Sequence, residues 1–380
     1  NESLYRGKRA LSREALAGAQ TMHELFRRNG YRTVCVGKIS HTPDGRVFAY
    51  DGSGDGRDEL PNAWDVLATP FGPWERGWGA FFAYAGGRHR EDGSGARSVF
   101  EFVVETDDAL PDGLMARVAV EQLEELGERD GPFFLGVGFF KPHLPFVATR
   151  ADLTAFEDGE VPPPPRPGPL EGPYGSRSGE FMRYRGAGED VLEARRAYLA
   201  CVRYVDRQVG VVLDALEETS LAENTIVVVW GDHGWHLGDS GIWGKHTLLD
   251  RSLRSVLMVR APGVTRPGSR TASLVATLDL YPTLIDLCGL EDRRTTHELN
   301  GVTLRPLLDG TAPSVRDAVT ARWGNAATVR TETHRLLARR RDGEWRDVRL
   351  YLTADGPDPV SDRSSAEPKT VEALLERLGS

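Results

Sequence analysis

Short apolar runs, each followed by glycine or polar residues, punctuate the first two thirds of the chain. They lie at 31–36 (YRTVCV), 133–140 (FFLGVGFF) and 226–230 (IVVVW). Runs of this length rich in valine and phenylalanine predict strands, and the third run predicts a strand buried on both faces, as in a parallel sheet.

Segments with apolar residues at helical spacing lie before and between these runs. The segment 21–29 predicts a helix with Thr21 as N-cap, Glu24 three residues later and Gly30 just past its end. Further helices are predicted at 112–129, 193–218 and 279–290. Strands alternating with helices indicate an α/β fold with a mostly parallel central sheet flanked by helices.

The last part of the chain follows a different pattern. Short strands are predicted at 327–330, 334–341 and 345–351, with Asp342–Gly343 as a hairpin turn, and a final helix at 370–378. We therefore expect an α/β domain over 1–314 and a small α+β C-terminal subdomain over 315–380. The segments 42–98 and 150–190 lack periodicity; the first is expected to be a long excursion held by packed tryptophans.

Composition excludes several classes of protein. The 380 residues carry a net charge of −9, which argues against a nucleic-acid surface. No apolar run approaches the length of a membrane span, so none is expected. Cys35, Cys201 and Cys288 have no CxxC spacing and are expected to be buried thiols that do not fix the compartment. Residues 1–16 contain no initiator Met and no apolar signal core.

Basic residues, imidazoles and one carboxylate follow the three predicted strands. Because the carboxyl ends of parallel strands share one edge of a sheet, these side chains are expected around one crevice. Lysines would offset the charge of a small dianion, histidines could pass a proton, and a metal could polarise an oxygen. The residues are Lys38 and His41, Lys141 and His143, and Asp232, His233 and Lys245.

Each of these residues also has an ordinary structural use. Lys38 and Lys245 could be solvated, His143 between two prolines could be a structural histidine, and Asp232 could cap the turn that follows. The repetition of the pattern at three strand ends favours the functional interpretation. Asp232 and His233 offer an oxygen and a nitrogen ligand, so this pair is the predicted site of a divalent cation.

Four motifs resemble the sulfatase family, and iduronate-2-sulfatase-like members most of all. GDHGWHLGDSGIWGK at 231–245 is similar to the family's metal-binding loop, and FFLGVGFFKPHLPF at 133–146 is similar to its strand with a KPH turn. YRTVCVGKISH at 31–41 and LYLTADGPDPVSD at 350–362 resemble its GK…H segment and its C-terminal strand and turn. The resemblance extends from about Thr21 to the C-terminus.

The resemblance implies an alkaline-phosphatase-like fold, secretion or a periplasmic location, and a sulfated carbohydrate or other sulfate ester as substrate. It implies one Ca²⁺ and a protein that hydrolyses the ester. The implied roles are calcium ligation by Asp232 and His233, sulfate binding by Lys38 and Lys245, sulfate contact and proton donation to the leaving alcohol by His143, and a position near the same group for His41.

Two motifs of the family are absent from this sequence. Sulfatases make a formylglycine nucleophile from a C/S-x-P-x-R motif and use an Asp–Asp pair after the first strand as metal ligands. The sequence contains no C/S-x-P-x-R, and Asp107–Asp108 lies in a region unlike the family's first strand. The chain thus resembles a sulfatase without its N-terminal portion, and we expect it not to hydrolyse esters by itself.

Two alternatives stay open from the sequence. One is a non-catalytic anion- or glycan-binding protein on a sulfatase scaffold. The other is a related metal-dependent phosphoesterase, which would share the fold and the metal site at the strand ends.

Overall fold

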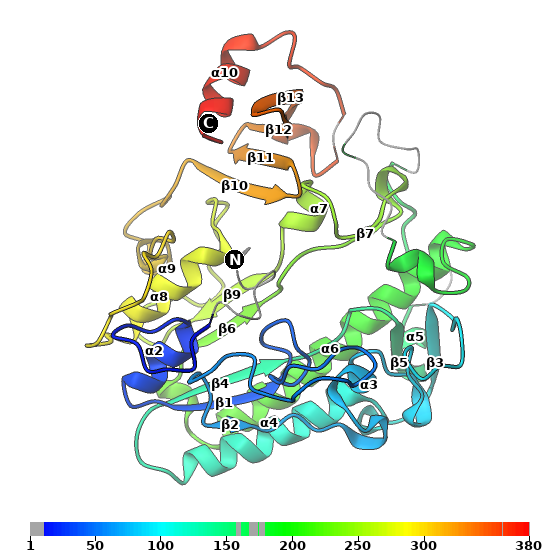
Figure 1. Ribbon diagram of the computed structural model, residues 1–380, viewed down its shortest axis with the longest axis vertical. Helices are drawn as coiled ribbons and strands as arrows, with labels where there is room; N and C mark the ends of the chain where they lie inside the picture. The colour runs from blue at the N-terminus through cyan, green and yellow to red at the C-terminus, as the bar shows by residue number, and fades with distance from the viewer. Residues whose placement is uncertain (1–10, 157–160, 167–173, 175–178, 359, 380) are drawn as a thin grey trace. The chain divides into compact units, whose positions relative to one another are not determined.

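A computed structural model describes residues 11–156, 161–166, 174, 179–358 and 360–379 (Figure 1). The chain groups into two compact units, and each is described by itself. The first comprises Asn1–Val161, Arg183–Asn224 and Gly289–Glu298, and the second comprises Pro162–Met182, Thr225–Cys288 and Leu299–Ser380.

The first unit is built on parallel strands, as the sequence predicted. Its main sheet has the order β2-β1-β4, and Gly37 at the end of β1 lies opposite Gly138 at the end of β4. A second parallel pair joins β3 to β5. The strands are β1 (Arg32–Gly37), β2 (Val66–Leu67), β3 (Phe100–Val104), β4 (Phe133–Gly138) and β5 (Phe146–Thr149).

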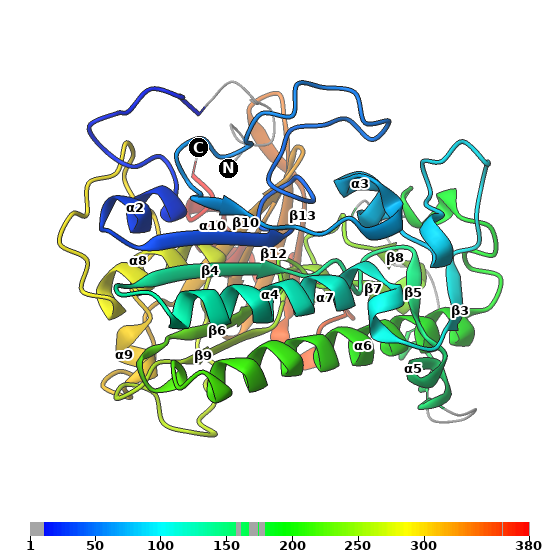
Figure 2. The ribbon, with the colours of Figure 1, turned by 90° about the horizontal axis from the view of Figure 1, so that it is seen from below.

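Helices cover one face of this sheet, with α4 beneath β1 and β4 and α6 alongside α4 (Figure 2). The predicted start and end of α2 are confirmed: Thr21 Oγ1 accepts from the backbone N–H of Glu24 at 3.2 Å, and Gly30 has a φ of +83°. The helices are α2 (Met22–Arg28), α3 (Gly77–Phe81), α4 (Pro111–Gly127), α5 (Arg150–Thr154) and α6 (Val191–Glu218).

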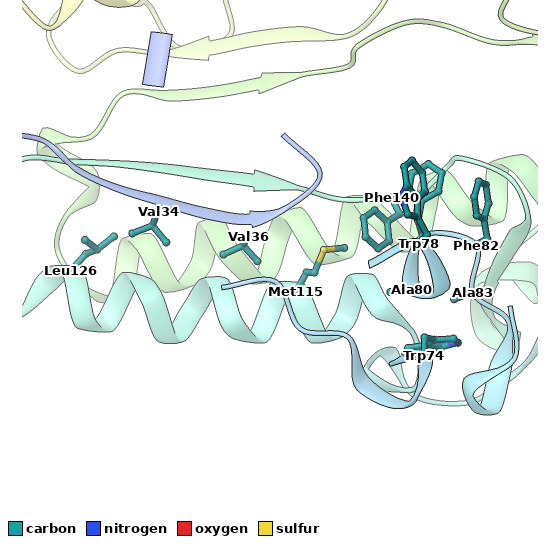
Figure 3. Close-up of a cluster of buried hydrophobic side chains, with 11 residues drawn as sticks. Val34, Val36, Trp74, Trp78, Ala80, Phe82, Ala83, Met115, Leu126 and Phe140 are labelled. Carbon is teal, nitrogen blue, oxygen red and sulfur yellow. The ribbon is translucent and has the colours of Figure 1, made fainter. Parts of the chain in front are cut away.

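The core of the unit lies between β1 and α4. Val34 and Val36 face Met115 and Leu126, and all four side chains are buried (Figure 3). An aromatic cluster continues this core beyond the strand ends, and its members come mostly from α3 and its flanks. They include Trp74, Trp78, Phe81, Phe82 and Phe140.

The tryptophans of segment 42–98 serve packing, as expected. Trp74 and Trp78 are buried, and their indole N–H groups donate to the carbonyls of Tyr84 and Phe48, both at 2.8 Å. These bonds tie the long excursion to itself and satisfy the polar edge of each ring.

The second unit contains a strand pair that differs from the prediction. The run at 226–230 forms β6 (Val227–Trp230), but β6 pairs antiparallel with β9 (Leu257–Arg260), and Trp230 is 46% exposed. The prediction of a parallel strand buried on both faces was therefore wrong for β6. An apolar run specifies a strand but not its direction or its number of neighbours, and the intervening loop returns the chain antiparallel.

Shorter elements complete this part of the second unit. They are β7 (His236–Leu237) and β8 (Trp243–Gly244), which pair antiparallel, and the helices α7 (Asp250–Leu253), α8 (Leu280–Leu287) and α9 (Arg305–Leu308). Among the described residues of both units, the short 3₁₀ helices are η1 (Gly72–Trp74), η2 (Ala85–Gly87), η3 (Asp107–Ala109), η4 (Phe181–Arg183), η5 (Ala222–Asn224), η6 (Asp239–Gly241), η7 (Thr277–Asp279) and η8 (Thr353–Asp355).

The C-terminal part of the second unit is an antiparallel meander closed by a helix, drawn in orange and red in Figure 1. Asp342 and Gly343 have positive φ values of 53° and 83° and form the predicted hairpin turn. Leu374 of the helix packs on Val329 and Leu350 of the sheet. The elements are β10 (Ala318–Trp323), which was not predicted, β11 (Ala326–Thr331), β12 (His334–Arg341), β13 (Glu344–Leu352) and α10 (Pro368–Glu376).

The boundary at 314/315 stays a prediction. No helix in the described ranges is long and apolar enough to cross a membrane. Cys35 and Cys201 are buried, as predicted, but Cys288 is only half-buried, because it follows the last turn of α8.

A buried histidine stabilises the loop after β6. His236 Nε2 lies 2.8 Å from Thr247 Oγ1, which lies 2.9 Å from Ser252 Oγ. The other ring nitrogen, Nδ1, is buried with no hydrogen-bond partner among the described residues. Burial lowers the pKa of His236 from 6.5 to about 4, since a charged ring would need a second acceptor that the described surroundings do not supply.

The close approach of β1 and β4 predicts a sharp response to Gly138→Ala. A methyl group at position 138 would overlap the Lys38 carbonyl, so we expect a loss of about 3 kcal/mol in the free energy of unfolding. Gly210→Ala in α6 is the control, because no atom lies within 4 Å of the added carbon. It should gain about 0.5–1 kcal/mol. Urea denaturation measures both, and equal stabilities of the two variants would contradict the packing.

His236 predicts acid sensitivity. Its folded pKa lies below the unfolded value, so its contribution is complete above pH 6.5 and is lost as the pH falls from 6.5 to about 4. The loss should reach about 3 kcal/mol. His236→Gln, which has no titrating ring, should show a flatter dependence of unfolding free energy on pH than the parent. Parallel curves for the two proteins would refute this role.

Candidate functional site

The ends of β1 and β4 lie at the same edge of the first unit's sheet. The backbone N–H of Lys38 donates to the Gly138 carbonyl at 2.8 Å, directly beyond the last paired residues. Gly138 leaves no room for a side chain against the Lys38 backbone. The parallel pairing therefore brings Lys38 next to the segment that carries His143, as the sequence predicted.

His143 is fixed in one orientation by its own turn. Its backbone N–H donates to the Phe140 carbonyl at 2.9 Å, and its Nδ1 lies 2.7 Å from the Leu144 carbonyl. A carbonyl only accepts, so Nδ1 carries a proton and Nε2 is the nitrogen that can exchange one in the neutral ring. The peptide bonds Lys141–Pro142 and Leu144–Pro145 are both cis.

Lys141 does not face a ligand, and its inclusion among the cations of the crevice was wrong. Its side chain is buried, and its ammonium donates to the carbonyls of Pro145 at 2.6 Å and His143 at 3.3 Å. Its backbone N–H donates to the buried carboxylate of Asp112 at 2.8 Å. Burial lowers the pKa of Lys141, while Asp112 favours the charged form. The lysine holds the turn under His143 from inside.

His41 lies near the same aromatic cluster as His143. The His41 ring centroid is 6.3 Å from that of Trp78, which is 5.4 Å from Phe81, and Phe81 is 4.5 Å from His143. His41 is exposed, whereas His143 and Lys38 are half-buried. The first unit thus carries Lys38 and the His143 turn at adjoining strand ends and His41 next to Trp78 of the aromatic cluster, and their action as one site stays a prediction.

The second unit carries the predicted metal pair. Asp232 Oδ2 lies 3.6 Å from His233 Nε2, and the Asp232 side chain is 63% exposed. His233 Nδ1 lies 2.8 Å from the Gly234 carbonyl, so Nδ1 holds the proton and Nε2 presents a lone pair. An oxygen and a nitrogen at this separation fit two positions around one divalent cation.

The aromatic ring of Trp235 connects this pair to Lys245. Its centroid lies 6.5 Å from that of His233, and Lys245 Nζ lies 5.9 Å from it. Lys245 Nζ also lies 3.9 Å from Glu180 Oε2, with the two side chains 20% and 19% exposed. Asp232, His233 and Lys245 therefore belong to one loop region, and a carboxylate accompanies the lysine.

The described residues supply only part of a metal shell. They contain no group of three or more His, Cys, Asp or Glu that could hold a metal ion. Asp107 and Asp108 are engaged elsewhere: Arg207 Nη1 donates to Asp107 Oδ2 at 2.6 Å, and Arg117 Nη2 donates to Asp108 Oδ2 at 2.5 Å. These two ion pairs join η3 to α6 and to α4.

The candidate residues fall three on each unit, and their meeting at one crevice stays a prediction. Sequence reasoning missed the partners that orient them, Asp112, Phe81 and Glu180. Asp112 opens a predicted helix and Phe81 lies in an aromatic run, but nothing in either pattern identifies what they contact. Glu180 lies in the connection at 150–190, where no periodicity exists.

Comparison with known proteins identifies the family. Residues 7–290 match the sulfatase family, and residues 238–356 match the family described as N-sulphoglucosamine sulphohydrolase, C-terminal. Iduronate 2-sulfatase of Mus musculus is 30% identical over 322 residues, which cover 71% of this chain and 54% of that enzyme. The chain spans about half the length of curated relatives such as these.

Solved structures share the fold. The phosphonate monoester hydrolase of Agrobacterium radiobacter has a TM-score of 0.72 at 20% identity, covering 98% of this chain and 82% of that one. A protein in complex with its substrate D-glucosamine-2-N,6-O-disulfate has a TM-score of 0.67 at 18% identity, covering 97% and 83%. The parallel sheet with flanking helices and the antiparallel C-terminal sheet agree with these neighbours. Because residues 7–290 match the family, the chain belongs to the sulfatases of the alkaline-phosphatase-like superfamily.

Proposed function

We propose that this chain provides the sulfate-binding and proton-donating part of a sulfuric ester hydrolase that acts on a sulfated sugar. One observation carries the proposal. Lys38 and the His143 turn lie at the adjoining carboxyl ends of β1 and β4, in a chain that belongs to the sulfatases. A cation and an imidazole with a fixed tautomer at one edge suit an oxyanion and its leaving group.

The charges suit a sulfate ester. Lys38 and Lys245 would bind sulfate oxygens, since ammonium groups form short hydrogen bonds to oxyanions. His143 in its imidazolium form would give the Nε2 proton to the departing alcohol and keep the Nδ1 proton, because Nδ1 is engaged with the Leu144 carbonyl. His41 would contact the same group from the exposed side of the aromatic cluster.

Asp232 and His233 would hold a divalent cation, proposed to be Ca²⁺. When bound, such an ion polarises an ester oxygen and offsets charge on the sulfate. Asp232 and His233 supply one oxygen and one nitrogen, and Ca²⁺ takes six to eight ligands that are mostly oxygens. The remaining ligands would therefore come from water, sulfate or other protein oxygens.

The 380 residues contain no C/S-x-P-x-R motif. We therefore expect the chain to bind sulfate esters without turning them over. The substrate is proposed to be a sulfated glycan, because one relative is an iduronate 2-sulfatase and one structural neighbour binds a glucosamine disulfate. We also propose that the protein is exported to the periplasm or secreted.

A metal-dependent phosphoesterase is the second candidate. The structural likeness to a phosphonate monoester hydrolase favours it. The site would then prefer a phosphate ester to the matching sulfate ester, which a direct competition between 4-nitrophenyl phosphate and 4-nitrophenyl sulfate resolves. A non-catalytic glycan-binding protein on the sulfatase scaffold would also bind sulfated sugars. A longer protein that contains a C/S-x-P-x-R segment and still hydrolyses no ester would support this alternative.

Metal binding tests the role of the Asp232–His233 pair. Asp232→Asn and His233→Ala each remove a ligand, so we expect each to weaken Ca²⁺ binding by at least about tenfold. Titration calorimetry and metal content after dialysis measure this without any activity assay. Asp214→Asn, an exposed carboxylate of α6, is the control and should leave Ca²⁺ binding unchanged. Equal calcium content in all four proteins would remove the metal assignment.

Binding of 4-nitrophenyl sulfate tests the function itself. Lys245→Met should weaken its affinity about tenfold through loss of a charged hydrogen bond. Glu180→Gln should strengthen it about threefold, since Glu180 competes for the same ammonium at 3.9 Å. Opposite shifts in the two dissociation constants support the site. An unchanged constant in Lys245→Met, or a parent that prefers the phosphate ester, would overturn the proposal.

A further inference from the structure

Trp323 is a large aromatic side chain that the fold leaves half exposed. It ends β10 and lies opposite Ala326 across a tight turn in which Gly324 has a φ of +59°. Its side chain is 50% exposed, although it belongs to a strand of the closed meander (β10 in Figure 1). The turn holds the ring at the end of the sheet, outside the core formed with α10.

One ring partner orients this indole. The His246 imidazole stacks on Trp323 with a centroid distance of 4.8 Å and an angle of 11° between the rings. Val256 and Met258, which are also exposed in this unit, are aliphatic and present no such flat surface. Trp323 is therefore an aromatic platform stacked on a half-buried histidine.

The platform adjoins the lysine of the candidate sulfate site. His246 directly follows Lys245 in the chain, so their Cα atoms are about 3.8 Å apart. Burial lowers the pKa of His246, and the Lys245 charge lowers it further while Glu180 raises it. Lys245 and Glu180 therefore both interact electrostatically with the histidine that stacks on Trp323.

We propose that the Trp323–His246 stack is a sugar subsite of the sulfate ester. The apolar C–H face of a pyranose ring would lie on the indole of Trp323 while Lys245 holds the sulfate of the same molecule. Aromatic faces next to a few charged groups are the usual lining of ligand sites, and an exposed, preoriented indole needs little further ordering. The inference rests on the proposed function and assigns its carbohydrate specificity to the C-terminal sheet.

Three ligands test the subsite: D-glucosamine-2-N,6-O-disulfate, unsulfated D-glucosamine and inorganic sulfate. Calorimetry on the 380-residue chain should show that Trp323→Leu weakens the sugar sulfate about tenfold, as expected for loss of an aromatic anchor. Inorganic sulfate should bind as it does to the parent, which also shows that the variant is folded. Trp323→Tyr keeps an aromatic face and should retain most of the affinity, and His246→Ala should give an intermediate loss.

The outcomes separate the two proposals. If Trp323→Leu binds the sugar sulfate as the parent does while Lys245→Met weakens both sulfated ligands, the subsite is wrong and the sulfate site stands. Equal losses in Trp323→Leu for inorganic sulfate and sugar sulfate would also overturn the subsite, because the effect would not depend on the sugar. If the parent binds neither sulfated ligand, the proposed function fails and the subsite fails with it.

Discussion

The pairing of β1 with β4 is the constraint on which the first half of the site depends. Gly37 lies opposite Gly138, and the Lys38 backbone packs on Gly138 without space for a methyl group. Parallel strands end at one edge, so this contact determines where Lys38 and the turn with His143 emerge. Val36 of β1 packs against Met115 of α4 in the core, and this contact positions the sheet edge relative to α4.

The two site histidines are oriented by the same local device. His143 and His233 each direct Nδ1 to the carbonyl of the next residue, at 2.7 Å and 2.8 Å. This leaves Nε2 as the chemically available nitrogen in both rings, for a proton in one and for a metal in the other. A bond between neighbouring residues needs no distant partner, so the tautomer is set by the turn itself.

The lysines divide into two kinds by what they contact. The Lys141 side chain is buried, and its ammonium donates to carbonyls of its own turn. The Asp112 carboxylate accepts from the Lys141 backbone N–H. Lys245 is partly exposed beside Glu180 and the Trp235 ring. A buried ammonium that donates to carbonyls of its own turn is shielded from a ligand in solution, whereas a partly exposed lysine next to one carboxylate can exchange that partner for an anion.

Local features of the fold could be predicted from the sequence. Thr21 and Gly30 bound α2, and Asp342–Gly343 turns the β12–β13 hairpin, because cap and turn chemistry act within a few residues. The strand ends that carry Lys38 and His143 followed from the apolar runs. These features depend on neighbours in the chain, which the sequence displays directly.

Features that depend on distant partners could not be predicted. β6 carries an apolar run, yet its antiparallel pairing with β9 is decided by a strand beyond a long loop. The inward direction of Lys141 depends on Asp112, 29 residues earlier in the chain. Strand β10 and the stacking of Trp323 on His246 also join segments that no periodicity relates.

The central proposal is that the adjoining carboxyl ends of β1 and β4 present Lys38 and His143 to a doubly charged anion. A crystal structure of the chain with selenate, whose selenium is located by anomalous scattering, tests it most directly. The account predicts a selenate beside the His143 turn, with Lys38 Nζ at about 2.7–2.9 Å from one of its oxygens. Selenate bound away from these strand ends, with Lys38 facing solvent, would contradict it.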